Sequence, residues 1–192
     1  MNKIKAFFDN IASCWDNACD DMHLVNTLLD ELNIKNGDMV LDVACGKGII
    51  TPLLHDRSQN KVLAIDISDE MIKGAKLKYK GNPDLKFISG DFLEAGFEDQ
   101  FDYIVMYNAY PHFLDVETLS LVVYKALKKG GHFAIIHSIS KEELNSHHEQ
   151  KAMGVSRYLE SAQIEAKKFE TQFKLEKCLD DNAYLIVLKK LS

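Results

Sequence analysis

The sequence predicts an α/β fold: a doubly wound, mostly parallel seven-stranded sheet with helices on both faces and a C-terminal antiparallel hairpin. Short apolar strand candidates alternate with helix candidates from residue 39 onward, and a glycine-containing turn follows the first strand. Two strand-like runs close the chain with no helix between them. Alternation of strands and helices is typical of a parallel sheet covered on both faces, and two successive strands indicate a hairpin.

The N-terminal part of the chain is expected to be helical. Residues 4–32 fit two helices, and the second carries apolar residues at helical spacing before a turn at Asn36-Gly37. No internal repeat or linker interrupts the sequence, so we expect a single domain over residues 1–192. Within it, residues 1–35 would form a helical cap and residues 36–192 a Rossmann-like core.

The expected elements of the core follow one another in a regular order. The run at 101–107 is continuously apolar, which indicates a strand that is buried on both faces. The strands are expected at 39–43, 61–66, 85–89, 101–107 and 132–137, and the helices at 49–57, 68–79, 116–127 and 140–150.

Capping residues support these helix boundaries. Ser68 is an N-cap followed by acidic residues in the first turn, and Ser140 forms a capping box with Glu143. Gly130-Gly131 is expected to end the helix that begins at residue 116. The final hairpin would join strands at 169–177 and 183–190 through residues 179–182.

Composition narrows the function classes. The 192 residues carry 23 basic and 29 acidic side chains, and no basic block indicates a nucleic-acid partner. Neither a signal peptide nor an apolar run of membrane-spanning length is present, so we expect a cytoplasmic protein without a membrane partner, as a monomer or homodimer. The four cysteines form no CxxC pair, which argues against structural zinc, and they should stay reduced in that compartment.

The turn at residues 42–48 contains the chemistry expected of a ligand site. Small residues at 44, 46 and 48 allow a ligand to approach the backbone. A nicotinamide dinucleotide fingerprint would need a third glycine where Thr51 stands, so an oxidoreductase is disfavoured. The carboxylate of Asp42 at the strand end would repel a diphosphate and attract an ammonium group.

Carboxylates also end the next two strands. Asp66 can accept two hydrogen bonds from a ribose diol, and Asp91 can accept one from an adenine amine. Ile67 and Phe92 would form an apolar slot for the purine. Together with Asp42, the ordered set indicates a nucleoside that bears an amino acid.

These motifs resemble those of class I S-adenosylmethionine-dependent methyltransferases over nearly the whole chain. Residues 40–48 resemble the glycine-rich first motif, 64–71 the acidic second motif, and 90–92 the third. The strand at 101–108 also matches, and residues 7–15 resemble the cap of the ubiquinone/menaquinone-biosynthesis type. The resemblance implies S-adenosylmethionine as the methyl donor and a donor site formed by Asp42, Ala44, Cys45, Gly46, Gly48, Asp66, Ile67, Met71, Asp91, Phe92 and Asn108.

Three residues in these motifs call for separate expectations. Ala44 replaces the usual first glycine, and its methyl group is expected to be a small perturbation. Cys45 is expected to fill the turn, not to act as a nucleophile, because methyl transfer has no covalent enzyme step. Trp15 is expected to cover the pocket as a lid.

Polar residues beyond the fourth and fifth strands are candidates for acceptor chemistry. The candidate catalytic residues are His112, Tyr110, His137 and His148. His112 has the side-chain pKa range of a general base, and Asn145 shares a helix face with His148.

The expected reaction is methyl transfer from S-adenosylmethionine to a small-molecule acceptor. The sequence leaves two alternatives open, a non-catalytic module that binds the nucleoside and a metal-dependent methyltransferase that uses the histidine cluster. No metal ligand is assigned. A third interpretation gives the histidines no role in the reaction. The histidine at the strand end would then have its hydrogen bonds satisfied within the protein, and the helix that follows would simply be polar and solvated.

Overall fold

The computed structural model describes residues 2–15, 21–152 and 154–191. Its centre is a seven-stranded sheet in the order β3-β2-β1-β4-β5-β7-β6. The strands are β1 (Val40–Val43), β2 (Val62–Asp66), β3 (Leu85–Ser89), β4 (Phe101–Tyr107), β5 (Leu127–His137), β6 (Phe173–Asp180) and β7 (Tyr184–Lys190).

The sheet topology confirms the predicted fold class. Strands β1 to β5 pair in parallel, and β7 pairs antiparallel with both β5 and β6. The C-terminal hairpin therefore inserts one antiparallel strand beside an otherwise parallel set. The strand order reverses between β1 and β4, the position at which doubly wound sheets bind ligands.

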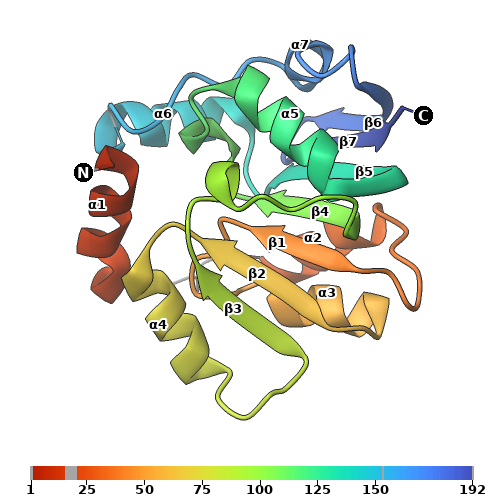
Figure 1. Cartoon of the computed structure of the whole chain (residues 1–192). Helices are drawn as coiled ribbons and strands as arrows, with labels where there is room; N and C mark the ends of the chain where they lie inside the picture. The colour runs from red at the N-terminus through yellow and green to blue at the C-terminus, as the bar shows by residue number, and fades with distance from the viewer. Residues whose placement is uncertain (1, 16–20, 153, 192) are drawn as a thin grey trace.

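Helices cover both faces of the sheet, and α1 lies beyond the arrowheads of β1 and β2 (Figure 1). Within the described residues, no helix is long and apolar enough to cross a membrane. The helices are α1 (Lys3–Ile11), η1 (Ala12–Cys14), α2 (Met22–Asp30), α3 (Thr51–Ser58), α4 (Asp69–Lys78), η2 (Phe92–Glu94), η3 (Tyr110–His112), α5 (Val116–Ala126), α6 (Lys141–Lys151) and α7 (Ala162–Lys167).

Strand β4 contributes side chains to two hydrophobic cores, one on each face of the sheet. Ile104 and Met106 pack into the core formed with α5 and α7, whereas Tyr103 and Val105 pack into the core formed with α2, α3 and α4. Successive side chains of a strand point to opposite faces, so a continuously apolar run is needed when both faces are covered. The predicted burial of this strand on both faces is confirmed.

The N-caps of α4 and α6 are confirmed. The hydroxyl of Ser68 accepts a hydrogen bond from the Met71 amide, and that of Ser140 accepts one from the Glu143 amide. These caps fix where the two helices begin, directly after the turns that follow β2 and β5.

The predicted glycine cap of α5 is wrong. The helix ends at Ala126, and β5 begins at once with Leu127 in an extended conformation. Gly131 instead lies against backbone oxygens of β4, where a Cβ would come within 3.1 Å of the Asp102 oxygen. The glycines therefore permit an irregular stretch of β5, where its pairing with β4 shifts register between Phe101 and Tyr103.

The C-terminal region also differs from the prediction. The first strand of the hairpin begins at Phe173, four residues later than expected, because the chain from Phe169 continues the turns that follow α7. Phe169 is fully buried in the α5 and α7 core. From the sequence, Phe169 is predicted to be the first residue of a strand because it is apolar, whereas it lies in a buried turn.

Candidate active site

A pocket of about 810 Å³ lies at the carboxyl ends of the parallel strands. Its walls come from the segments that follow β1, β2, β3 and β4, and from α1 and α6. Of the eleven residues assigned to the donor site from the sequence, all but Gly48 line this pocket. They are Asp42, Ala44, Cys45, Gly46, Asp66, Ile67, Met71, Asp91, Phe92 and Asn108.

The turn after β1 is built from residues with positive φ. Ala44, Gly46 and Gly48 have φ values of 56°, 53° and 78°. For Ala44 this left-handed conformation carries a backbone cost of roughly 1–2 kcal/mol, so the expectation of a small steric perturbation omitted the main effect. Gly48 packs against the ring of Phe87, where a Cβ would lie 2.8 Å from its Cε1 atom, which explains the glycine without a ligand contact.

Asp42 is the last residue but one of β1, and its carboxyl group is buried. Its Oδ2 atom accepts a hydrogen bond of 2.6 Å from the Thr51 hydroxyl, and its Oδ1 atom has no hydrogen-bond partner among the described residues. Burial raises the pKa of Asp42 to about 7, the Thr51 hydrogen bond opposes the rise, and the Asp66 charge adds to it. A cationic or hydrogen-bond-donating ligand group would satisfy the free oxygen.

Asp66 holds two turns together at the end of β2. Its two oxygens accept hydrogen bonds of 2.8 Å from the amides of Gly46 and Ser68. Burial raises the pKa of Asp66, and these two hydrogen bonds oppose the rise. Since a carboxylate oxygen has two lone pairs, each oxygen retains the capacity to accept a hydrogen bond from a ligand hydroxyl.

Two further donor-site residues are held by local hydrogen bonds. Asp91 caps η2 through its Oδ1 atom, which accepts from the Leu93 amide, and so fixes Phe92 next to it. Asn108, with φ at 51°, exchanges two hydrogen bonds with Ser138 and thereby ties the ends of β4 and β5 together. Both side chains are thus positioned by the protein itself.

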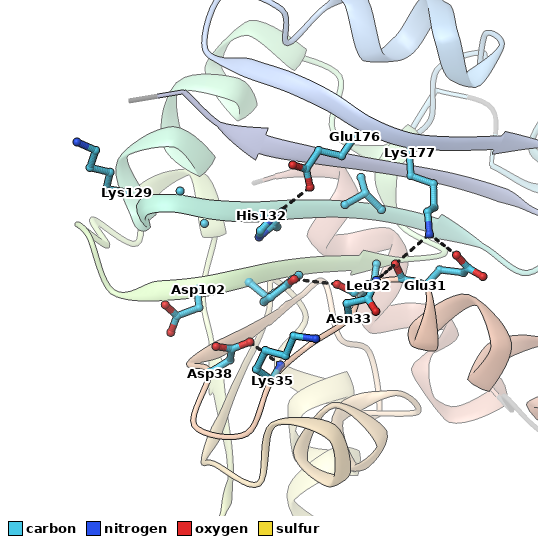
Figure 2. Close-up of a pocket in the computed structure, with 14 residues that line it drawn as sticks. Glu31, Leu32, Asn33, Lys35, Asp38, Asp102, Lys129, His132, Glu176 and Lys177 are labelled. Carbon is cyan, nitrogen blue, oxygen red and sulfur yellow. Dashed lines mark hydrogen bonds and ion pairs between the residues drawn. The ribbon is translucent and has the colours of Figure 1, made fainter.

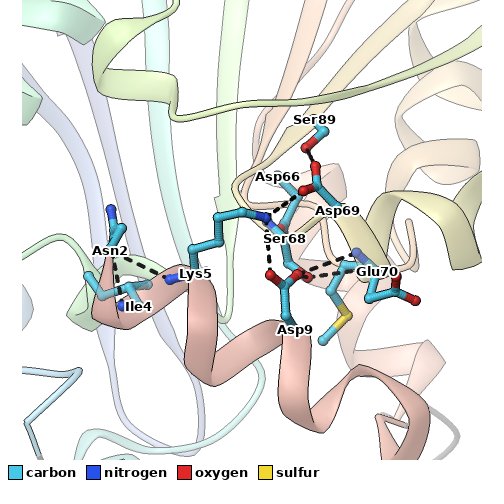
Figure 3. Close-up of polar contacts among 10 residues, drawn as sticks. Asn2, Ile4, Lys5, Asp9, Asp66, Ser68, Asp69, Glu70 and Ser89 are labelled. Atoms are coloured by element: carbon cyan, nitrogen blue, oxygen red, sulfur yellow. Dashed lines mark hydrogen bonds and ion pairs between the residues drawn. The ribbon is translucent and has the colours of Figure 1, made fainter.

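Helix α1 covers the pocket and is fastened to the turn that follows Asp66 (Figure 3). The Asp9 carboxylate accepts a hydrogen bond of 2.7 Å from the Ser68 hydroxyl, and Lys5 forms ion pairs with Asp9 at 3.0 Å and Asp69 at 2.7 Å. The amide of Ser68 is bonded to Asp66. Helix α1 and Asp66, the carboxylate expected to bind the ribose, are therefore both hydrogen-bonded to the same turn.

Trp15 follows η1, the short helix after α1, and lies over the glycine turn. Its side chain lines the pocket, and its Nε1 atom would lie 3.8 Å from a Cβ built on Gly46. Its backbone oxygen accepts a hydrogen bond from Lys47. This position fits the expected lid, whose function stays a prediction.

Two of the four candidate catalytic residues line the pocket, His112 and His148. Their rings lie 5.1 Å apart, and the ring of Phe8 meets His112 edge to face at 4.9 Å. The Nδ1 atom of His112 lies 2.8 Å from the Val155 carbonyl oxygen. Burial lowers the pKa of His112 and lowers that of His148 to about 4, so both rings are neutral at pH 7.

The other two candidates lie outside the residues that line the pocket. Tyr110 is fully buried and donates its hydroxyl to Glu165 at 2.7 Å. His137 is fully buried as well, with neither ring nitrogen hydrogen-bonded among the described residues, and burial lowers its pKa to about 3. Their positions correct the expectation that they contact the acceptor.

Asn145 is also removed from the acceptor candidates. Its side chain exchanges two hydrogen bonds with the backbone of Leu159, which fastens α6 to the segment before α7. His148 lies one turn further along α6 and faces the pocket.

The described residues contain no group of three or more His, Cys, Asp or Glu side chains arranged to hold a metal ion. The metal-dependent alternative therefore has no support in this geometry.

Cys45 is a buried thiol with a raised pKa, caused first by burial and then by the nearby carboxylates. Cys14, Cys45 and Cys178 form no disulfide, and Cys19 lies outside the described residues.

Sequence reasoning missed much of the apolar wall. Phe7, Phe8 and Ile11 come from α1, and Phe113 and Leu144 from the far side of the pocket. Among residues of α1, none is fully buried, which suits a helix with one face toward a cavity. The aromatic pair in the first ten residues was the available signal for this wall.

A second cleft, of about 520 Å³, lies at the opposite end of the sheet (Figure 2). Its charged side chains are largely paired, since His132 contacts Glu176 at 3.1 Å and Lys177 contacts Glu31. The Tyr103 ring stacks on His132 and its hydroxyl donates to the Leu32 carbonyl. Its carboxylates lie among the side chains of Lys35, Lys129 and Lys177, so this cleft, unlike the larger pocket, is lined by both acidic and basic groups.

Residues 41–135 match the methyltransferase-domain family. A sterol 24-C-methyltransferase from Saccharomyces cerevisiae is 34% identical over 106 residues, which cover 53% of this chain and 28% of that protein. A chloroplastic 2-phytyl-1,4-beta-naphthoquinone methyltransferase from Arabidopsis thaliana is 28% identical over 152 residues, covering 70% of this chain and 57% of that protein. The chain thus spans between 28% and 57% of the length of such curated relatives.

Solved structures agree in fold. A methyltransferase chain from a Haloferax volcanii complex with a methyltransferase activator superposes with a TM-score of 0.85, at 20% identity and 98% coverage of both chains. An S-adenosylmethionine-dependent methyltransferase from Aquifex aeolicus gives 0.75, at 20% identity, covering 96% of this chain and 98% of the other. The chain therefore shares the fold of these solved methyltransferases, and residues 41–135 match the methyltransferase-domain family, in agreement with the resemblance found in its sequence.

Proposed function

We propose that the protein transfers the methyl group of S-adenosylmethionine to a small-molecule acceptor. The observation that carries this proposal is the meeting of Asp42, Asp66 and Asp91 in one pocket at the ends of three strands. In the proposed complex Asp42 binds the ammonium group, Asp66 the ribose diol and Asp91 the adenine amine. Phe92 and Ile67 contact the purine.

The buried Oδ1 atom of Asp42 supports this fit. An unsatisfied buried acceptor costs about 1–3 kcal/mol, and a bound ammonium group would remove that cost. All charged side chains that line the described part of the pocket are acidic, which favours a ligand with a positive charge. S-adenosylmethionine meets both conditions through its ammonium and sulfonium groups.

The chain's own contribution to the reaction is positioning and exclusion of water. S-adenosylmethionine supplies a methyl group that is already activated on sulfur. Alignment of two bound reactants can lower a barrier by about 7–11 kcal/mol. The aromatic residues of α1 close the pocket over the reactants, and His112 and His148 face the acceptor from the other side.

The acceptor and the cellular setting belong to the same proposal. The relatives are named for methylation of sterols and of a phytyl-naphthoquinone, and we extend from them only that the acceptor is a small molecule. We propose one methyltransferase domain with residues 1–35 as its cap, in the cytoplasm, as a monomer or homodimer. A non-catalytic nucleoside-binding module is the alternative, and it would bind the donor without consuming it.

Titration calorimetry with S-adenosylhomocysteine, the demethylated product, tests donor binding directly. We expect saturable binding by the wild type and a loss of about tenfold or more in affinity for Asp66→Asn, equivalent to about 1.4 kcal/mol. Asp84→Asn is the matched control, because Asp84 precedes β3 at the opposite end of the strands. Absence of binding by folded wild-type protein would remove the proposal.

A further inference from the structure

The side chains that line the pocket restrict which acceptor can bind there. The inference drawn from them rests on the proposed function. The side of the pocket away from the three carboxylates is lined by Phe7, Phe8, Phe113 and Leu144 together with His112 and His148. Aromatic edges and faces of this kind favour a flat, apolar ring.

The charge of this wall restricts the acceptor further. Lysine and arginine are absent from the described residues that line the pocket. Three histidines line the pocket. His112 and His148 are neutral at pH 7, because burial lowers the pKa of each, and the third, His147, is exposed. A carboxylate or phosphate on the acceptor would therefore lose its hydration without gaining a cationic partner, which is unfavourable.

His112 has a fixed tautomer. A carbonyl oxygen can only accept a hydrogen bond, so the 2.8 Å contact with Val155 requires the proton to be on Nδ1. The Nε2 atom of the neutral ring then carries a lone pair and can accept a proton. Protonation would produce an imidazolium whose Nδ1–H still donates to Val155, so the charged form is held in the same orientation.

The segment that carries Val155 also fixes the backbone around His112. The Arg157 amide donates to the Pro111 carbonyl at 2.9 Å, and Arg157 is itself paired with buried Glu165. The loop on which His112 lies is therefore held by backbone and side-chain contacts alike. A base must be held in this way to act at a defined atom.

We propose that the acceptor is an uncharged aromatic hydroxyl compound and that Nε2 of His112 removes its hydroxyl proton as the methyl group is transferred. The oxygen–methyl bond forms while the sulfur–methyl bond breaks, and the electron pair of the broken bond goes to sulfur. The hydroxyl proton goes to His112, which releases it to solvent after the product leaves. The products are an aryl methyl ether and S-adenosylhomocysteine.

The first test compares acceptors that differ in one group. Uncharged catechols and naphthols are assayed beside the same rings bearing a carboxylate, and S-adenosylhomocysteine formation is measured by mass spectrometry. We expect kcat/KM to be at least about tenfold higher for the uncharged member of each pair. Preference for the carboxylates, or no turnover of any aromatic hydroxyl compound by protein that binds S-adenosylhomocysteine, would overturn the inference while leaving the proposed function intact.

The second test is His112→Asn, whose side-chain amide can still donate to Val155. We expect kcat to fall by about 10²–10⁴-fold with unchanged binding of S-adenosylhomocysteine. In a pH profile, the wild type should lose activity on the acidic side only below the ordinary titration range of histidine. The variant should not show this loss. His55→Asn is the control, because His55 also contacts a backbone carbonyl through Nδ1, that of Asn60, but lies on α3 outside the pocket. A kcat within about threefold of wild type for His112→Asn would refute the assigned base.

Discussion

Replacing Glu165 with glutamine is expected to destabilise the protein by about 3–5 kcal/mol, the usual cost of removing one partner of a buried ion pair. The Glu165 side chain is fully buried and accepts from Arg157 at 2.8 Å, Lys168 at 3.0 Å and the Tyr110 hydroxyl at 2.7 Å. In the variant, Arg157, whose side chain is 16% exposed and stacks on the Tyr110 ring, would lose its compensating carboxylate.

Urea denaturation of wild type and Glu165→Gln measures this effect. Glu70→Gln serves as the control, since the Lys73–Glu70 pair has the same spacing as Lys168–Glu165 but is exposed, and such pairs contribute little. A free energy of unfolding for Glu165→Gln within about 0.5 kcal/mol of the control variant would contradict the account of this network.

The same carboxylate should influence acid stability. Hydrogen bonds from Arg157, Tyr110 and Lys168 lower the pKa of Glu165 to about 2 against the opposing effect of burial. A lowered pKa in the folded state means that Glu165 stabilises the protein fully above its ordinary pKa of 4.5. That stabilisation is lost as the pH falls from this value toward 2.

Donor binding is expected to weaken by about tenfold or more when the pH falls from about 7.5 to about 5.5. The pKa of Asp42 is raised to about 7 by burial, so the carboxyl group is largely protonated at the lower pH. A bound ammonium group requires the ionised form, and each pH unit below the pKa then costs close to 1.4 kcal/mol. The raised pKa of Asp66 acts in the same direction.

Calorimetry with S-adenosylhomocysteine across this pH range, on wild type and Asp42→Asn, tests the prediction. Asp42→Asn should bind more weakly at neutral pH and show a shallower pH dependence, with the remainder due to Asp66. The unliganded wild type should also lose stability as the pH rises from about 4 to about 7, because a raised pKa favours the folded state only while Asp42 is protonated. An affinity independent of pH, or a full pH dependence in Asp42→Asn, would contradict the assignment.

Features with local causes were predictable from the sequence. The N-caps at Ser68 and Ser140 depend on bonds within three residues, and the acids at the ends of β1 and β2 follow directly from apolar runs. Since parallel strands bring their carboxyl ends to one edge, the order of Asp42, Asp66 and Asp91 was enough to place them in one pocket.

Features with distant causes were not predictable. Tyr110 resembled a catalytic residue because it follows β4, but its partner Glu165 lies 55 positions along the chain. His137 was assigned to the acceptor site from its position at the end of β5, yet pairing of β5 with β7 brings the ring of Tyr184 within 5.8 Å and buries it. The sequence around these two residues does not indicate that tertiary packing buries them away from the pocket.

A crystal structure of the protein with S-adenosylhomocysteine tests the central assignment most directly. We expect the ligand's ammonium group at Oδ1 of Asp42, its ribose hydroxyls at Asp66, and its adenine between Ile67 and Phe92 with the exocyclic amine toward Asp91. A ligand bound elsewhere, or bound in this pocket without contacts to Asp42 and Asp66, would contradict it.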